Sequence, residues 1–210
     1  MKTTSLKVQL TFTEPLLGSA SNNKDIHEEF IAAKAPTPSA AEEEVDAIGE
    51  FQKSMTVFPA DDNGLFLWDY QVRGFFKEAI GVLIELGEIK DLSKYAHKKA
   101  VDSTLFIRER KIHLTNAGGT IYTSAPDVHQ RPLRAETMRG ERVALASSQR
   151  LPAGTLAKFT VTLLESSNTK TKLATLDLDA LKAALDYGAL KGLGQWRSGG
   201  FGRFTWKELS

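Results

Sequence analysis

The part of the sequence with the clearest chemical potential is a glycine-rich segment near its C-terminal end, GLGQWRSGGFGRF at 192–204. Dense glycine permits positive φ angles and the close approach of a second backbone, and successive amides that point inward can cradle phosphate oxygens. Arg197 and Arg203 would add positive charge, and the ring of Trp196 or Phe201 would offer a stacking face. The alternative interpretation is a glycine-rich turn whose aromatic residues belong to the core.

Arginines are concentrated in a second segment, at 131–150, where five arginines face two glutamates. Cations on neighbouring strands could extend a track of phosphate contacts. The alternative is a solvated strand face that carries arginine without a ligand. The residues that would form such a track are Arg131, Arg134, Arg139 and Arg142.

The composition of the 210 residues restricts what these segments can do. Hydrophobic content of 41% and charged content of 25% are typical of a globular chain, and the net charge is +1. Because the charges nearly balance, any attraction to nucleic acid must come from their segregation along the chain. The chain has no cysteine, which excludes disulfides and thiolate chemistry. No apolar window is long enough to span a membrane and the N-terminus lacks a signal-peptide core, so we expect a cytoplasmic protein without a membrane partner.

Sequence motifs for several enzyme classes are missing. The sequence contains no Walker loop, dinucleotide fingerprint, Gly-x-Ser-x-Gly elbow or His-Glu-x-x-His pair. These absences argue against nucleotide hydrolysis, hydride transfer, acyl transfer and zinc proteolysis, and we expect no cofactor.

The elements that would position the chemical residues follow from hydrophobic periodicity. Alternation predicts strands at 5–13, 55–59, 65–68, 105–114, 120–123, 133–137, 143–147, 156–164 and 201–206. Helical spacing predicts helices at 24–33, 39–52, 69–87, 92–100 and 177–187. Gly188 is expected to end the last of these helices.

The order of these elements predicts an α+β fold. Without insertions it reads strand, helix, strand, strand, helix, strand, which is the split βαβ order of a modified ferredoxin-like, RRM-like βαββαβ domain. We expect an antiparallel sheet with helices on one face. One domain would span 1–210, with an acidic helical insertion at 20–54 and a polar insertion at 88–130.

Three segments, in this order along the chain, resemble the RAMP (repeat-associated mysterious protein) superfamily, whose members form the backbone of CRISPR effector complexes. The segment LWDYQVRGFFK at 67–77 is similar to their strand-to-helix junction with an Arg-Gly step, here Arg73-Gly74. The segment RAETMRGER at 134–142, followed by LPAGT at 151–155, resembles their basic hairpin and Pro-x-Gly-Thr turn. Segment 192–204 resembles the glycine-rich loop that is their hallmark. Asp69 departs from the family pattern, because a carboxylate is a poor neighbour for phosphate.

The resemblance implies an RNA-binding protein that holds single-stranded, guide-like RNA by its phosphates, alone or as one copy in a filament with itself or other effector subunits. It would not read sequence. The residues expected to contact RNA are Arg73, Lys77, Arg131, Arg134, Arg139, Arg142, Lys191, Gly192, Gly194, Trp196, Arg197, Gly199, Gly200 and Arg203.

Two alternatives remain open beside this non-catalytic role. The first is a structural or interaction protein that keeps the fold without RNA, such as a mimic of a CRISPR complex or a phage factor. The second is an RNA endonuclease, because target-cleaving relatives carry an aspartate after the first strand, where Asp25 and His27 stand here. A carboxylate there could recruit a divalent metal, although Asp25 would also stabilise the first turn of a helix. The other candidates are Asp46, Asp61 and Asp62 for a metal, and His113 and His129 for a metal-free general base.

Overall fold

The computed structural model describes residues 2–21, 55–90, 92–137, 140–165 and 176–210, with side chains described outside 133–144. The two helices expected within 20–54 lie outside these residues, together with Asp25, His27 and Asp46. The described chain is a mixed α+β structure dominated by antiparallel sheets.

The larger sheet is assembled from strands that are far apart in the sequence. Its order is β12 (Phe204–Glu208), β1 (Lys2–Phe12), β11 (Leu156–Glu165), β8 (Lys111–Thr115), β6 (Gly64–Trp68) and β5 (Ala60–Asp61). The short strand β7 (Leu105–Ile107) pairs with β11 beside β8. All of these pairings are antiparallel.

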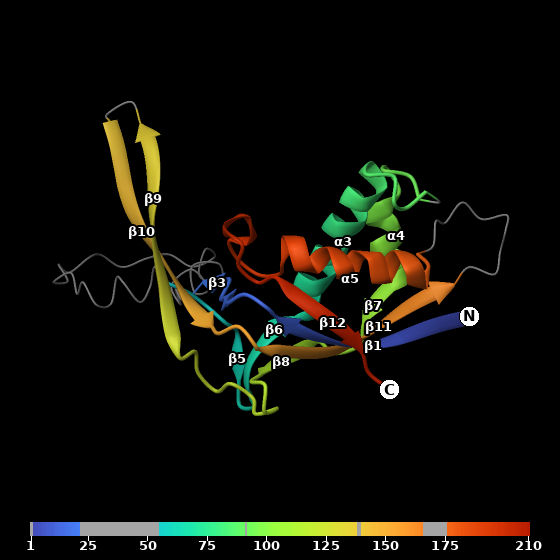
Figure 1. Ribbon diagram of the computed structural model, residues 1–210, viewed down its shortest axis with the longest axis horizontal. Coiled ribbons are helices and arrows are strands. Elements are labelled where there is room, and N and C mark those ends of the chain that lie inside the picture. Colours follow the sequence, from blue (N-terminus) through green and yellow to red (C-terminus); the bar gives the residue numbers. More distant parts are fainter. Residues whose placement is uncertain (1, 22–54, 91, 138–139, 166–175) are drawn as a thin grey trace, which may run out of the picture.

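Three helices cover one face of this sheet: α3 (Asp69–Glu85), α4 (His97–Thr104) and α5 (Leu178–Lys191) (Figure 1). The alternation in β1 turns Leu6, Val8 and Leu10 toward them, each at most 2% exposed. Helical spacing in α3 supplies the opposing side of the core, with Phe76 and Ile80 fully buried. The opposite face of the central strands carries polar residues.

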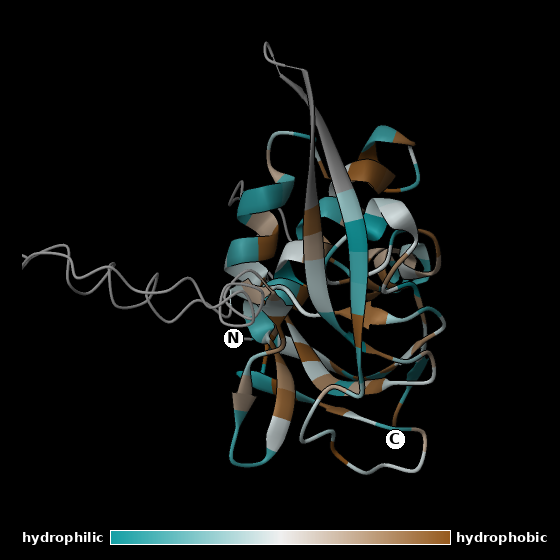
Figure 2. Ribbon diagram, turned by 90° about the vertical axis from the view of Figure 1, so that its left-hand side faces the viewer, coloured by the Kyte–Doolittle hydropathy of each residue, from teal (hydrophilic) through white to brown (hydrophobic). Residues whose placement is uncertain are grey.

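A smaller sheet holds a long hairpin. Its order is β2 (Leu16–Leu17), β10 (Gly140–Leu151), β4 (Thr56–Val57) and β3 (Ala20–Ser21), and β9 (Asp127–Thr137) pairs with β10. The hairpin of β9 and β10 projects away from the helices and the larger sheet (Figures 1 and 2). The two segments predicted as separate strands at 133–137 and 143–147 are parts of this longer hairpin.

Several predicted element boundaries were wrong. The strand expected at 105–114 is divided into β7 and β8, and the strand at 120–123 is reduced to a bridge between Thr115 and Ile121. The helix expected at 92–100 begins and ends later, as α4. Segment 88–130, expected to be a polar insertion, contains α4, β7 and β8, and each of these elements has buried residues.

The end of α5 also differs from the prediction. Gly188 does not end α5, which continues to Lys191 and is capped by Gly192 at φ +78°. The glycine at 188 serves packing, because a Cβ there would lie 2.1 Å from the Phe204 ring. The final strand begins at Phe204, since 201–203 complete the preceding loop.

Candidate functional site

The neck of the glycine-rich loop (192–203) is closed by backbone contacts. The amide of Leu193 donates to the carbonyl of Gly202 at 2.8 Å, and the amide of Gly202 donates to Pro15 at 2.9 Å. A Cβ at Gly202 would lie 1.8 Å from the Leu193 oxygen, and one at Gly192 would lie 2.6 Å from the oxygen of Phe201. These glycines therefore allow one strand of the neck to lie directly on the other.

The tip of the loop is a short 3₁₀ turn at Arg197–Gly199. The amides of Gly199 and Gly200 donate to the carbonyls of Trp196 and Arg197, at 2.9 Å each. Both amides are already used inside the loop, so any phosphate contact at the tip must come from other groups. Gln195 fixes the position of the tip, because its Oε1 accepts from Thr56 Oγ1 at 2.7 Å.

Aromatic rings join the loop to the base of the hairpin. Trp196 and Phe201 stack with centroids 5.0 Å apart, and the ring of His129 on β9 lies 5.3 Å and 4.8 Å from them. The guanidinium of Arg131 lies over Trp196, 4.1 Å from the ring centroid. The Phe201 ring stacks on the indole, and the guanidinium of Arg131, a residue of β9, lies over the same indole. Trp196 is thus a packing residue that holds the loop against β9, at a strained φ of +52°.

A cavity of about 550 Å³ opens beside these rings, and we call it the loop–hairpin cleft. Four of its lining residues carry its chemistry: Arg203 and Phe201 from the loop, and His129 and Arg150 from the hairpin. Glu14 also lines it. Arg150 is paired with Asp127 at 2.5 Å, whereas no ion pair joins Arg203 to another described residue. The cleft therefore offers one unpaired and one paired guanidinium to an anion.

His129 is the unusual residue of the cleft. Its Nε2 is buried and has no hydrogen-bond partner in the described structure. Burial, and then the positive charges of Arg150 and Arg131, lower the pKa of His129, although Asp127 acts in the opposite direction. The imidazole is therefore neutral near pH 7, with a free ring nitrogen beside two arginines.

The expected cations on the helices are each paired with a carboxylate. Arg73 pairs with Asp69 at 3.1 Å, and Lys77 pairs with Asp102 at 2.5 Å. Asp69 also binds Arg110 at 2.6 Å. This buried carboxylate occupies the first turn of α3, where the sequence resemblance had placed RNA phosphates.

Glu78 of α3 takes the two remaining cations, Lys191 at 2.7 Å and Arg197. Partial burial alone would raise the pKa of Glu78, but the hydrogen bonds from Lys191 and Arg197 outweigh it and hold the pKa below its ordinary value. Arg197 thus joins the loop to α3, while Arg203 faces the cleft. Among the cations whose side chains are described, the structure does not form one unpaired trough.

The hairpin arginines are only partly described. Arg131 lies at the Trp196 ring. Arg134 lies on β9 and Arg142 on β10, one position apart in the strand pairing. Their side chains lie outside the described part of the structure. Arg139 lies outside the described residues.

Two of the catalytic candidates, Asp61 and His113, are hydrogen-bonded to each other. Asp61 accepts from Lys111 at 2.8 Å, from His113 at 3.0 Å and from the amide of Asn63 at 3.0 Å. The hydrogen bonds from Lys111 and His113 hold the pKa of Asp61 well below its usual range. Within the described ranges, no group of three or more His, Cys, Asp or Glu side chains is arranged to hold a metal ion.

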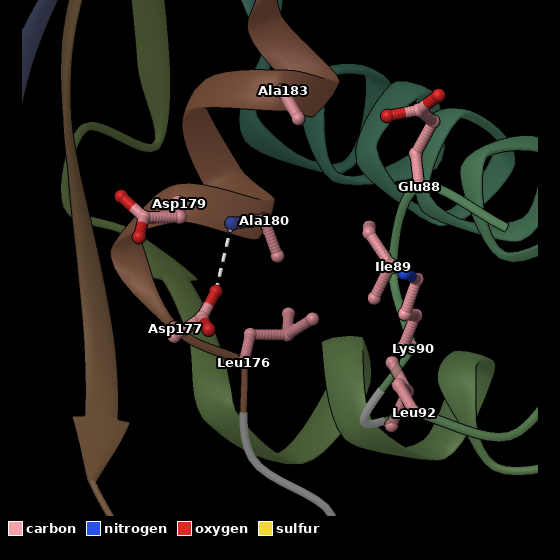
Figure 3. Close-up of a pocket in the computed structure, with 9 residues that line it drawn as sticks. All are labelled: Glu88, Ile89, Lys90, Leu92, Leu176, Asp177, Asp179, Ala180 and Ala183. Atoms are coloured by element: carbon pink, nitrogen blue, oxygen red, sulfur yellow. Dashed lines mark hydrogen bonds between the residues drawn. The ribbon is translucent and has the colours of Figure 1, made fainter.

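A second cavity, of about 240 Å³, lies between segment 88–92 and the start of α5 (Figure 3). Its rim carries the carboxylates of Glu88, Asp177 and Asp179, and Leu176 and Ala180 are among its apolar lining residues. Asp177 is used as the N-cap of α5, where it accepts from the Ala180 amide at 2.7 Å. Lys90 also lines the cavity, so its three carboxylates outnumber one cation, and Asp177 already occupies the N-terminal amides of α5 in part.

Sequence reasoning did not place Glu14, Arg150 or Gln195 at the site. Gln195 stands inside the glycine-rich segment and could have been noticed there. Arg150 ends the arginine-rich segment 131–150, whereas nothing local marks Glu14, which only the fold brings to the loop.

No protein-family model matches the chain, and no curated protein is significantly similar to it. Across the described part of the chain, no helix combines the length and the apolar character needed to cross a membrane.

Proposed function

We propose that the chain is a RAMP-like protein that holds single-stranded RNA by its phosphates, with a ferredoxin-like core beneath the binding loop. The strand order supports this core. If β1, the β7–β8 segment, β11 and β12 are numbered one to four, they lie in the order four, one, three, two, and α3 and α5 are the helices between them in sequence. That is the arrangement of a split βαβ domain.

The observation that carries the proposal is the loop–hairpin cleft. It lies where the glycine-rich loop meets the arginine-rich hairpin, and it holds Arg203, which has no carboxylate partner among the described residues. Arg150 and the neutral His129 lie beside it. Guanidinium groups are suited to phosphate because they bind two oxygens at once.

In this arrangement the cleft contacts the RNA backbone, and sequence is not read. Arg203 and Arg150 bind phosphate oxygens. That Arg134, Arg139 and Arg142 extend the path along the hairpin stays a prediction, because their side chains lie outside the described part of the structure. The paired cations Arg73, Lys77, Lys191 and Arg197 stabilise the loop and α3. In the proposal, several copies of the chain, or other effector subunits, lie along one guide-like RNA in the cytoplasm. The projecting hairpin is long enough to contact a neighbouring subunit.

The test is the salt dependence of single-stranded RNA affinity. Replacing Arg203 and Arg150 by alanine removes the two guanidinium groups that line the cleft, and neither residue belongs to the hydrophobic core. The slope of log affinity against log salt should flatten by about 1.4, at about 0.7 for each lost phosphate contact. Lys99→Ala is the control, because Lys99 is exposed on α4, away from the cleft. Identical slopes for the double variant and the wild type would refute the proposal.

A second candidate is an interaction protein with the same fold and no RNA. The observation that favours it is the neutralisation of four expected RNA-binding cations by Asp69, Glu78 and Asp102. It predicts protein that is purified free of nucleic acid and an affinity for RNA that is negligible at physiological salt. A 260/280 absorbance ratio typical of bound RNA in the purified protein would count against it.

The endonuclease alternative has its own test. Asp25 and His27 lie outside the described residues, so incubation of labelled RNA with and without EDTA addresses them directly. No products in either condition would exclude cleavage of that RNA.

A further inference from the structure

The face of the larger sheet that the helices leave open carries a cluster of unpaired lysines. In β1, β11 and β12 the residues that alternate with the core point away from the helices, and these include Lys7, Lys158 and Lys207, all exposed. Within the described chain, none of the three forms an ion pair with a carboxylate side chain. Lys7 has one other contact, from its Nζ to the backbone oxygen of Ser210 at 3.4 Å.

The strand register places these lysines close together. Gln9 of β1 pairs with Lys158 on one side and with Lys207 on the other. With neighbouring strands about 4.8 Å apart, the two lysines lie roughly 10 Å apart at Cα. Lys7 is two residues from Gln9 on the same strand, so it is a diagonal neighbour of both, at about 7–8 Å. Gln9, which lies between Lys158 and Lys207, is only 8% exposed.

The surroundings of the triangle are polar and almost free of acidic residues. The open face of β1, β7, β11 and β12 holds no Asp or Glu within these strands, because Glu165 and Glu208 lie in register with core-facing residues. One carboxylate reaches this face: Glu109, from the turn after β7, accepts from the amide and hydroxyl of Thr160, the residue opposite Lys7 on β11. The other polar residues of the face are Ser5, Thr11, Thr162, Thr205 and Arg108.

This cluster differs from the cations of the helix side in one respect. Arg73, Lys77, Lys191 and Arg197 each have a carboxylate partner, whereas the three lysines stand next to one another without a carboxylate side chain as partner. Like charges within about 10 Å of one another on an exposed face repel each other. A bound polyanion would remove that repulsion.

We propose that this lysine face (Lys7, Lys158, Lys207 and Arg108) binds the phosphate backbone of a second nucleic-acid segment. Lysine and hydroxyl side chains are common phosphate contacts. A protein partner fits less well, because lysine is depleted and aromatic residues are enriched at the centres of protein interfaces. Here Phe106, 43% exposed, is the large apolar residue of the face, and it lies on the short strand β7 rather than among the lysines. Without aromatic rings at the centre, the contact is to phosphates and not to stacked bases.

The lysine face and the loop–hairpin cleft are separate surfaces. Figure 1 shows the glycine-rich loop rising on the same side of the larger sheet as the helices. The alternation of β1, β11 and β12 turns the lysines to the other side. One chain can therefore hold two nucleic-acid segments at once, one on each side.

The experiment measures how many short oligouridines, each too short to reach around the domain, one full-length chain binds. Two oligouridines with donor and acceptor dyes should both bind to one chain and show energy transfer. Replacing Lys7, Lys158 and Lys207 by glutamine should reduce binding to one oligonucleotide and flatten the salt slope by about 2. The control replaces Lys90, Lys98 and Lys99, which are exposed elsewhere, and should leave both unchanged. A parallel series with duplex RNA identifies which form the lysine face prefers.

The outcomes separate this inference from the proposed function. If the lysine variant binds as many oligonucleotides as the wild type, with an unchanged salt slope, the lysine face is not a binding surface. If the wild type binds one oligonucleotide, the Arg150/Arg203 variant still binds it and the lysine variant binds none, the lysine face stands and the cleft does not. An acidic peptide that displaces both RNA forms from the lysine face, with no RNA in the purified protein, would overturn the choice of nucleic acid.

Discussion

Two glycines inside helices provide a matched test of the packing described above. Gly74 lies in α3 and Gly188 in α5, and neither has a positive φ. A Cβ at Gly74 would meet nothing within 4 Å, whereas a Cβ at Gly188 would lie 2.1 Å from the Phe204 ring. The same substitution to alanine should therefore change stability in opposite directions.

The magnitudes follow from helix propensity and from the overlap. Alanine is better than glycine in a helix interior by about 1 kcal/mol, so Gly74→Ala should stabilise the protein by about that amount. At Gly188 the same gain is opposed by overpacking, which costs about 1–3 kcal/mol and sometimes more. Phe204 is fully buried, with the Phe75 ring 5.3 Å away, so it has little room to move. We expect a net loss of about 2 kcal/mol for Gly188→Ala.

Thermal and urea unfolding of both variants measure these changes. Since 1 kcal/mol corresponds to about 2–4 °C in Tm for a domain of this size, Gly74→Ala should melt a few degrees higher and Gly188→Ala several degrees lower. A stabilised Gly188→Ala would show that the α5–β12 packing is wrong. Gly74→Ala also has a functional reading: reduced RNA affinity with raised stability would indicate that a ligand approaches α3 at this glycine.

Three further predictions concern the loop, the start of α3 and the hairpin base. Gly202→Ala combines a φ of +70° with a Cβ placed 1.8 Å from the oxygen of Leu193; it should lower stability by at least about 2 kcal/mol in urea unfolding, and an unchanged midpoint would contradict the closed neck. Asp69→Asn leaves two arginines without their carboxylate and should cost about 1–2 kcal/mol at low salt, measured by the same method; a neutral result would show that this cluster is not stabilising. The lowered pKa of His129 means that the unfolded chain takes up this proton at a higher pH than the folded chain, so stability should fall as the pH drops from about 6.5 toward the lowered pKa. Denaturant midpoints near neutral and at mildly acidic pH should differ less in His129→Gln than in the wild type; equal differences would refute the assignment.

Much of the local structure could be predicted from the sequence, because it depends on neighbouring residues. The spacing of Val72, Phe76 and Ile80 predicts the buried face of α3, and alternation predicts β1 and β11. The Asn63-Gly64 pair, a common hairpin signal, lies at the turn between β5 and β6. The mixed α+β class with antiparallel sheets is confirmed.

The candidate site could be predicted only in part, because its partners are distant in sequence. The glycine-rich segment is a loop between α5 and β12, yet the neutralisation of Arg197 by Glu78 joins residues 119 positions apart. Periodicity carries no information on such ion pairs. The role of Gly188 is also invisible locally, because the ring that requires it belongs to β12.

The central claim is that RNA lies in the loop–hairpin cleft, and ultraviolet crosslinking followed by peptide mapping tests it most directly. Cleavage after arginine releases 198–203, the tip of the glycine-rich loop with Phe201, as one short peptide. We expect this peptide to carry a crosslinked nucleotide after irradiation of the wild-type complex. In the double alanine variant of the cleft arginines, cleavage no longer occurs after position 203, and the longer peptide that begins at Ser198 should carry no crosslink. Nucleotides found on other peptides alone, or on none, would contradict the account.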